Sequence, residues 1–238
     1  MNLHSLRNPR SYLAILVLLL GAIYLGNSDG EIMFDDSLQV HLVRSYQSLS
    51  EVLSVDCFDL FRPVKNLVFY LWVSYLPDQI QIWRVSAILI FLGLIPLAYR
   101  FFGLFFKNKP WSQLLCTAAW AIAPASTTVV SWISSVNIII CAYGFFAYFI
   151  LYEKAQNDAS EKRIHASYFA LCLSLLSLVV ACFSYEAAMT APFLCFLKDF
   201  LQHPKRYRSS HSRMFYGLSL SSRSIFRNSR NVWRGQYN

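Results

Sequence analysis

The order of apolar and polar positions predicts a chain that crosses a membrane several times. A helix needs about 20 mostly apolar residues to cross a bilayer. The first uncharged run covers residues 11–28 and follows Arg7 and Arg10. This run is either an uncleaved anchor or a cleaved signal peptide, and its length and poor cleavage sequence favour the anchor. A second span is expected at about residues 82–106.

Three further stretches supply the remaining predicted spans. Residues 110–152 contain no Asp, Glu, Lys or Arg, and this stretch is long enough for two crossings. Pro124 interrupts it and is followed by small polar residues, so we expect two spans, about 111–125 and 135–152, joined by a tight hairpin. Residues 167–184 predict a fifth span and the shorter run 187–201 a sixth. The pattern therefore predicts an all-α polytopic membrane protein with about six spans.

The polar loop after the first span is expected to fold into helices that lie in the membrane interface. Within residues 38–55, Leu and Tyr recur at helical spacing with polar residues between them. The run 66–77 is too short to cross a membrane and is rich in Tyr and Trp, which favour the interfacial depth. We therefore expect two interfacial helices in this loop.

Composition supports a membrane protein and excludes several soluble classes. Apolar residues make up 56% and charged residues only 14% of the 238 residues, whereas about a quarter of a soluble domain is charged. Five of the six Cys lie in apolar runs, which excludes a disulfide scaffold. The five His show no metal-ligand spacing, and no glycine-rich phosphate loop is present. A cytosolic nucleotide enzyme therefore has no support.

The net charge of +8 belongs to the C-terminal segment. Residues 204–238 contain eight basic residues and no acid, whereas residues 1–203 hold 13 of each sign. The excess charge is therefore local, and we expect no nucleic-acid partner. We expect a disordered Ser- and Arg-rich tail, 204–238, that binds anionic lipid. The transmembrane domain is then residues 1–203.

The positions of the basic residues predict the orientation. With the N-terminus in the cytoplasm, the internal segments before the tail hold nine basic residues, and the external loop 27–83 holds three basic residues and eight acids. This distribution follows the positive-inside rule and predicts that both termini are cytoplasmic. One external set then contains most of the candidate chemistry: Asp35, Asp36, Arg62, Lys65, Ser131–Ser134 and Glu186.

Two adjacent acids, Asp35 and Asp36, precede the first predicted interfacial helix. Asp36 with Gln39 matches a D-x-x-Q capping box, in which the Asp36 carboxylate accepts a hydrogen bond from an early N–H of the helix. That interpretation leaves Asp35 unexplained. The alternative is chemical, because a carboxylate held at the membrane boundary suits a general base or a metal ligand. The sequence leaves both interpretations open.

Two cations and a third acid complete the candidate residues. Arg62 and Lys65 mark either a turn at the lipid headgroups or a clamp for a lipid-linked phosphate, which two interfacial cations can hold. Glu186 lies between two apolar runs, where an ionisable residue is a functional candidate by default. It fits the solvated tip of an external hairpin equally well.

Four short motifs follow one another in a recognisable order. They are Phe34-Asp35-Asp36, then Phe61-Arg62-Pro63-Val64-Lys65, then Val130-Ser131-Trp132-Ile133-Ser134, and finally Ser184-Tyr185-Glu186. This order resembles the N-terminal half of a GT-C glycosyltransferase. The chain looks most like the protein O-mannosyltransferase and tetratricopeptide-associated transmembrane group and its bacterial relatives, over about residues 10–203.

The resemblance implies a GT-C-like fold in a bacterial inner membrane and sugar transfer from a polyprenyl-phosphate donor on the external face. It assigns Asp35 or Asp36 as the catalytic base and Glu186 as a second acidic site. Arg62 matches the motif arginine and, with Lys65, would stabilise the leaving phosphate. A divalent cation, Mg²⁺ or Mn²⁺, would have Asp35 and Asp36 as its first ligands.

Two questions stay open at this stage. The apolar pattern ends near residue 203, so we expect a truncated relative, and the sequence leaves open whether it is active. The alternative to an enzyme is a non-enzymatic polytopic protein or a transport subunit, in which the charges only set the topology. Ion-coupled transporters place charges at mid-membrane depth, and the predicted span centres contain none.

Overall fold

The computed structural model describes residues 8–28, 34–46, 48–53, 59–76 and 79–202. Throughout this part of the chain every regular element is a helix, so the all-α prediction is confirmed there. The chain divides into two units, Met1–Met189 and Thr190–Asn238, which are described separately. The predicted tail, with its binding to anionic lipid, lies outside the described residues.

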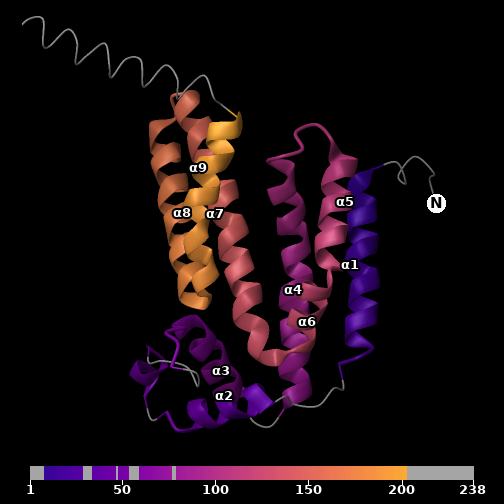
Figure 1. Cartoon of the computed structure of the whole chain (residues 1–238), viewed down its shortest axis with the longest axis vertical. Coiled ribbons are helices and arrows are strands. Elements are labelled where there is room, and N and C mark those ends of the chain that lie inside the picture. Colours follow the sequence, from indigo (N-terminus) through magenta and orange to yellow (C-terminus); the bar gives the residue numbers. More distant parts are fainter. Residues whose placement is uncertain (1–7, 29–33, 47, 54–58, 77–78, 203–238) are drawn as a thin grey trace, which may run out of the picture. The chain divides into compact units, whose positions relative to one another are not determined.

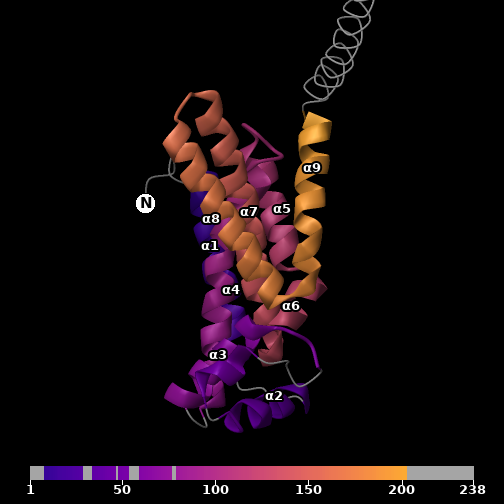
Figure 2. The same ribbon diagram turned by 90° about the vertical axis from the view of Figure 1, so that its left-hand side faces the viewer.

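The long helices of the first unit lie side by side (Figures 1 and 2). Helix α4 packs against α1, α5 and α7, and α7 packs against α8. Helices α2 and α3 pack together at the end of the unit where α4 begins. The elements of this unit are α1 (Pro9–Leu25), α2 (Phe34–Arg44), η2 (Leu49–Leu53), α3 (Pro63–Tyr75), α4 (Ile80–Gly103), α5 (Pro110–Ala121), α6 (Pro124–Ser131), η3 (Ile133–Ser135), α7 (Val136–Ser160) and α8 (Ile164–Ser184), with the 3₁₀ helix η4 (Glu186–Thr190) at its boundary.

Three helical segments in the described residues are long and apolar enough to cross a membrane. They are α4, the segment Ile133–Ser160 that contains η3 and α7, and α8. A fourth span results if the bent pair α5 and α6 is counted as one. The structure therefore fits a membrane protein with three to four candidate spans, and the predicted count of about six is not confirmed.

The predicted hairpin at residues 124–134 is wrong in detail, because α6 occupies most of it. Helix α5 ends at Ala121, and α6 leaves the break at an angle of 52°. Pro124 is the first residue of α6, and Ala123 before it is extended, with ψ of 143°. A proline disfavours helical backbone at the residue that precedes it, which accounts for the break.

The first and last predicted spans correspond to shorter helices. Helix α1 is an apolar helix of 17 residues and ends where Gly26 and Asn27 follow. In the second unit, α9 (Ala191–Gln202) has only 12 residues, because η4 takes the beginning of the predicted run. Helices α1 and α9 are both shorter than the three candidate spans.

The external loop contains helices, but with different bounds from those predicted. The single helix expected at 38–55 is divided into α2 and η2. Helix α2 ends near Ser45, whose hydroxyl donates to the Leu42 carbonyl at 2.6 Å and so competes with the helical backbone pattern. The helix expected at 66–77 begins earlier, at Pro63, a residue favoured at the first helical position.

Apolar packing fixes α3 against the start of α4. The rings of Trp72 and Trp83 stack with centroids 6.0 Å apart, and the Trp83 indole N–H donates to the Leu76 carbonyl at 2.8 Å. This packing holds the last turn of α3 against the beginning of α4.

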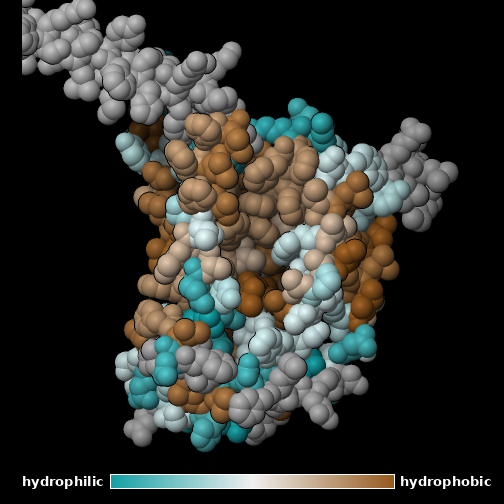
Figure 3. Space-filling view, viewed as in Figure 1, coloured by the Kyte–Doolittle hydropathy of each residue, from teal (hydrophilic) through white to brown (hydrophobic). Residues whose placement is uncertain are grey.

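The helix sides expose apolar side chains, as expected for contact with lipid. Leu18 of α1 and Phe169 of α8 are 72% and 67% exposed. Figure 3 shows hydrophobic side chains along the helix sides, while hydrophilic ones gather around α2 and α3 and near the α4–α5 connection. Patches of this kind mark a membrane or partner surface, and together with the span-length helices they fit bilayer contact.

A close contact between α4 and α7 gives a testable prediction. A Cβ atom added at Gly93 would lie 2.6 Å from the hydroxyl of Tyr143, which donates to the Ile90 carbonyl at 2.8 Å. We expect Gly93→Ala to destabilise the protein by about 1–3 kcal/mol through overpacking. Removing the hydroxyl in a Gly93→Ala/Tyr143→Phe double variant should recover much of that loss.

Thermal unfolding of the detergent-solubilised chain measures this coupling. The two substitutions should be less than additive, because they act on one contact. Additive losses would show that Gly93 and Tyr143 are independent.

Candidate functional site

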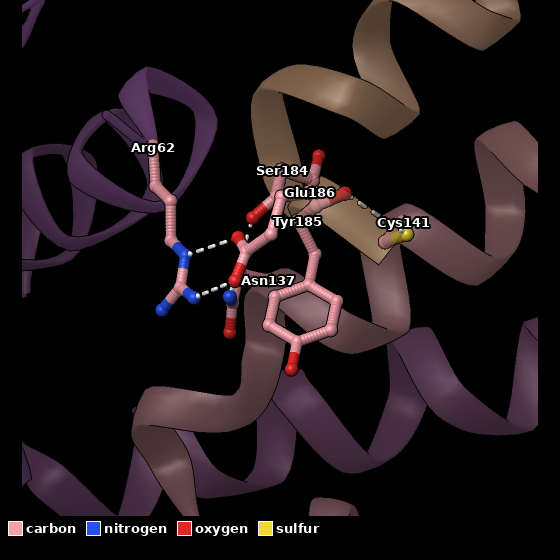
Figure 4. Close-up of polar contacts among 6 residues, drawn as sticks. All are labelled: Arg62, Asn137, Cys141, Ser184, Tyr185 and Glu186. Carbon is pink, nitrogen blue, oxygen red and sulfur yellow. Dashed lines mark hydrogen bonds and ion pairs between the residues drawn. The ribbon is translucent and has the colours of Figure 1, made fainter. Parts of the chain in front are cut away.

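The central feature of the site is an ion pair between Arg62 and Glu186, two positions singled out from the sequence. Arg62 Nη2 donates to Glu186 Oε1 at 2.7 Å, and Arg62 Nε donates to Oε2 at 3.1 Å (Figure 4). The guanidinium therefore binds both carboxylate oxygens in a bidentate fork, the strongest geometry for such a pair. The contact joins the start of α3 to the turn after α8, 124 residues apart in the chain.

Local backbone structure places both partners of the pair. Arg62 stands immediately before α3, and Pro63 begins that helix. Tyr185 ends α8 in an extended conformation, with φ of −157° and ψ of 131°, so the chain turns and presents Glu186 at the first position of η4. The Tyr185 ring lies beneath the guanidinium, with Arg62 Cζ 4.9 Å from its centroid. This cation–π contact helps to orient Arg62.

Polar contacts from α7 support the turn that carries Glu186. Asn137 Nδ2 donates to the Ser184 carbonyl at 3.2 Å, and Cys141 Sγ lies 3.8 Å from the Tyr185 carbonyl (Figure 4). These carbonyls lie at the C-terminal end of α8, where the helix has no further backbone N–H groups to donate to them. Sequence reasoning missed Asn137, although an Asn at the beginning of an apolar span was a usable signal.

The second feature of the site is Asp36, which connects α2 to the Trp-Ile-Ser segment. Its carboxylate accepts a hydrogen bond from the backbone N–H of Ser134 at 2.7 Å, and the residue is only 2% exposed. Asp36 is the third residue of α2 and not its N-cap, so the capping box predicted with Asp36 as the cap is wrong. Asp35 is partly exposed in the same turn.

Buried amides connect the same loop elements. Gln39 Nε2 donates to Asn66 Oδ1 at 3.0 Å, and Asn66 Nδ2 donates to the Val52 carbonyl at 3.2 Å. This network fixes η2 and α3 against α2, and neither amide was predicted as a site residue. Gln39 belongs to the polar positions of the expected interfacial helix and Asn66 is the first residue of the next one, so the apolar pattern gave no signal of their burial.

Lys65 differs from Arg62 in its surroundings. Lys65 is 2% exposed, whereas the Arg62 side chain is 13% exposed and faces the more open Glu186. A cation buried to this degree must be paired or hydrogen-bonded. Of the two predicted cations, Arg62 is therefore the one nearer to solvent.

The structure brings the predicted positions together as two contacts. Arg62 meets Glu186, and Asp36 meets Ser134, all within the first unit. Among the described residues, no group of three or more His, Cys, Asp or Glu is arranged to hold a metal ion. The divalent cation at Asp35 and Asp36 therefore stays a prediction from the sequence.

Acidification is expected to weaken the Arg62–Glu186 pair. The hydrogen bond from Arg62 lowers the pKa of Glu186 below its ordinary value, against a smaller opposing effect of desolvation. Because this pKa is lower in the folded than in the unfolded protein, the pair contributes fully at neutral pH and its contribution is lost as the pH falls through the lowered pKa. The Glu186 side chain is 55% exposed, so solvent screening limits the contribution to about 1 kcal/mol or less.

The pH dependence of the melting temperature checks this expectation. The difference between the natural protein and Glu186→Gln should shrink as the pH falls below the ordinary Glu pKa of about 4.3. A difference that stays constant over this range would show that the pair does not stabilise the fold.

Comparisons with known proteins give no further assignment to this site. No protein-family model matches the chain, and neither curated proteins nor solved structures show a match. The resemblance to GT-C glycosyltransferases therefore rests on the four sequence motifs alone.

Proposed function

We propose that this chain is a membrane glycosyltransferase of GT-C type, which transfers a sugar from a polyprenyl-phosphate donor to an acceptor on the external face. The observation that carries the proposal is that the four motifs contact one another in two pairs. The Arg-Pro motif meets the Ser-Tyr-Glu motif through Arg62 and Glu186, and the acidic pair meets the Trp-Ile-Ser motif through Asp36 and Ser134.

The proposed chemistry assigns a separate task to each side chain. Asp35, which is partly exposed, removes the proton from the acceptor hydroxyl as that oxygen attacks the anomeric carbon. The bond between the anomeric carbon and the phosphate oxygen breaks, and the lipid phosphate leaves with increased negative charge. Arg62 stabilises that charge with its fork of donors, with support from the positive charge of Lys65. Asp36 holds α2 against η3 through Ser134 and so positions Asp35.

The proposed membrane arrangement has six crossings and cytoplasmic termini in a bacterial inner membrane. Helix α1 supports this count, because it packs against the candidate span α4 and its length of 17 residues is at the lower limit of a span. Basic residues favour the same orientation. The α7–α8 connection contains Lys162 and Arg163, and the α4–α5 connection contains Lys107 and Lys109, so the positive-inside rule places these turns in the cytoplasm.

A second candidate is a non-enzymatic membrane protein in which the Arg62–Glu186 pair is a structural clasp. The bidentate pair itself favours this alternative. Arg62 Nε and Nη2 each donate to one Glu186 carboxylate oxygen, so the pair connects α3 to the turn after α8 without any ligand. In that case Arg62→Lys would change stability and no turnover would be found.

A turnover assay separates the two candidates. The full-length chain is reconstituted in vesicles with radiolabelled polyprenyl-phosphate hexoses, and release of polyprenyl phosphate is measured. We expect release above the vesicle background, and a loss of about 10- to 100-fold in Arg62→Lys, because an ammonium lacks the fork geometry. A folded protein that releases no lipid phosphate from any donor in the panel would contradict the proposed activity.

A further inference from the structure

The guanidinium edge that the proposed function assigns to a phosphate is already occupied by a carboxylate. Both oxygens of Glu186 accept from Nε and Nη2 of Arg62. Phosphate oxygens bind the same edge of an arginine in the same parallel manner. A phosphate and the Glu186 carboxylate therefore compete for one set of donors.

The two partners differ in how firmly they are held. The Arg62 side chain is 13% exposed, stands at the start of α3 and lies over the Tyr185 ring at 4.9 Å. The Glu186 side chain is 55% exposed and projects from the first residue of a short 3₁₀ helix. Glu186 is therefore the partner that can rotate into water while Arg62 keeps its place.

Electrostatics favours exchange of the carboxylate for a phosphate. The hydrogen bond from Arg62 lowers the pKa of Glu186, so the carboxylate is ionised and paired at neutral pH. A lipid monophosphate carries up to two negative charges and three acceptor oxygens on phosphorus.

We propose that Glu186 is an internal competitor that occupies Arg62 until the phosphate of a polyprenyl-phosphate ligand displaces it. This inference rests on the proposed function, since it takes Arg62 as the donor-phosphate site. Binding of polyprenyl monophosphate, the leaving group of the proposed transfer, then breaks the direct connection between α3 and the turn after α8. Removing the Glu186 charge raises the affinity for the phosphate, because the ligand no longer has to displace an ion pair.

Binding of farnesyl monophosphate to the purified full-length chain in lipid nanodiscs tests the proposal. We expect Glu186→Gln to bind this probe about three- to tenfold more tightly than the natural protein, as expected for release of an exposed ion pair. Arg62→Gln should bind it more weakly than the natural protein, and the double variant should match Arg62→Gln. Uncharged farnesol, as the control ligand, should bind all variants alike.

A matched variant controls for the loss of one acidic side chain. Glu153 pairs with Lys107 at 3.1 Å through one carboxylate oxygen, away from the Arg62 contact, and its side chain is 13% exposed. Glu153→Gln makes the same chemical change and should leave the affinity for farnesyl monophosphate unaltered. An equal gain in Glu153→Gln would attribute the effect to net charge and overturn the proposal.

The outcomes separate the competitor from the phosphate site. If Glu186→Gln binds the probe no better than the natural protein while Arg62→Gln loses binding, the internal competitor is overturned and the phosphate site stands. If Arg62→Gln binds as well as the natural protein, or no variant binds, the proposed donor site itself fails.

A measurement on the unsubstituted protein gives an independent result. Carbodiimide activates protonated carboxyl groups, so pairing with Arg62 should keep Glu186 modification slow. Saturating farnesyl monophosphate should increase the labelling of Glu186, read by mass spectrometry, and leave that of Glu153 unchanged. Unchanged or decreased labelling of Glu186 under saturation would overturn displacement.

Discussion

Replacing Asp35 by Asn is expected to lower the rate of sugar transfer by about 10²–10⁴-fold, the usual contribution of a general base. Asn has nearly the shape of Asp but cannot accept the proton of the acceptor hydroxyl. Asp35 is partly exposed at the first turn of α2, so the substitution should leave the fold intact. The assay is the release of polyprenyl phosphate, with folding checked by size-exclusion chromatography.

Asp36→Asn is the matched control for this prediction. The Asn side chain keeps an oxygen that can accept the hydrogen bond from the Ser134 N–H at 2.7 Å. We therefore expect a folded protein that retains most of its turnover. Asp36→Ala leaves that buried donor unpaired and should cost about 1–3 kcal/mol of stability. Near-normal turnover in Asp35→Asn with a large loss in Asp36→Asn would reverse the two assignments.

Replacing Gly144 by Leu is expected to prevent α7 and α8 from packing. A Cβ atom at this position would lie 2.5 Å from the Ser177 carbonyl oxygen and 2.8 Å from Ala181 Cβ. Both neighbours belong to α8, and the carbonyl is rigid backbone. Even Gly144→Ala should cost about 1–3 kcal/mol through overpacking, and the larger Leu should cost more.

A second helical glycine provides the control for Gly144. An added Cβ at Gly103, the last residue of α4, would meet only the Gln113 side chain at 3.6 Å, an ordinary contact distance. Gly103→Ala should therefore leave the melting temperature of the solubilised protein nearly unchanged. If Gly144→Ala and Gly103→Ala have the same melting temperature, α7 and α8 do not approach each other closely at Gly144.

The sequence located the long helices well because length and hydropathy determine a membrane span. The span predicted at 82–106 is α4, and those predicted at 135–152 and 167–184 are α7 and α8. Helix α7 continues to Ser160 because polar helix-forming residues extend it beyond the apolar run. Hydropathy could not show the bend between α5 and α6, which depends on the local backbone at Ala123.

The candidate site was predicted as a set of positions and not as a set of contacts. Charge distribution placed Arg62 and Glu186 on one side, but their pairing depends on how α3 packs near the end of α8. The hydrogen bond between Asp36 and Ser134 likewise joins segments 98 residues apart. A local capping pattern suggested another partner for Asp36, and tertiary packing overrode it.

Photocrosslinking with a diazirine-bearing polyprenyl-phosphate analogue tests the central claim most directly, because it maps where the lipid phosphate binds. We expect adducts in the peptides that carry Arg62 and Glu186, reduced by excess polyprenyl phosphate and lost in Arg62→Gln. Adducts spread along the exposed apolar sides of α1 and α8, unaffected by the competitor or by Arg62→Gln, would contradict a donor site at this end of the helices.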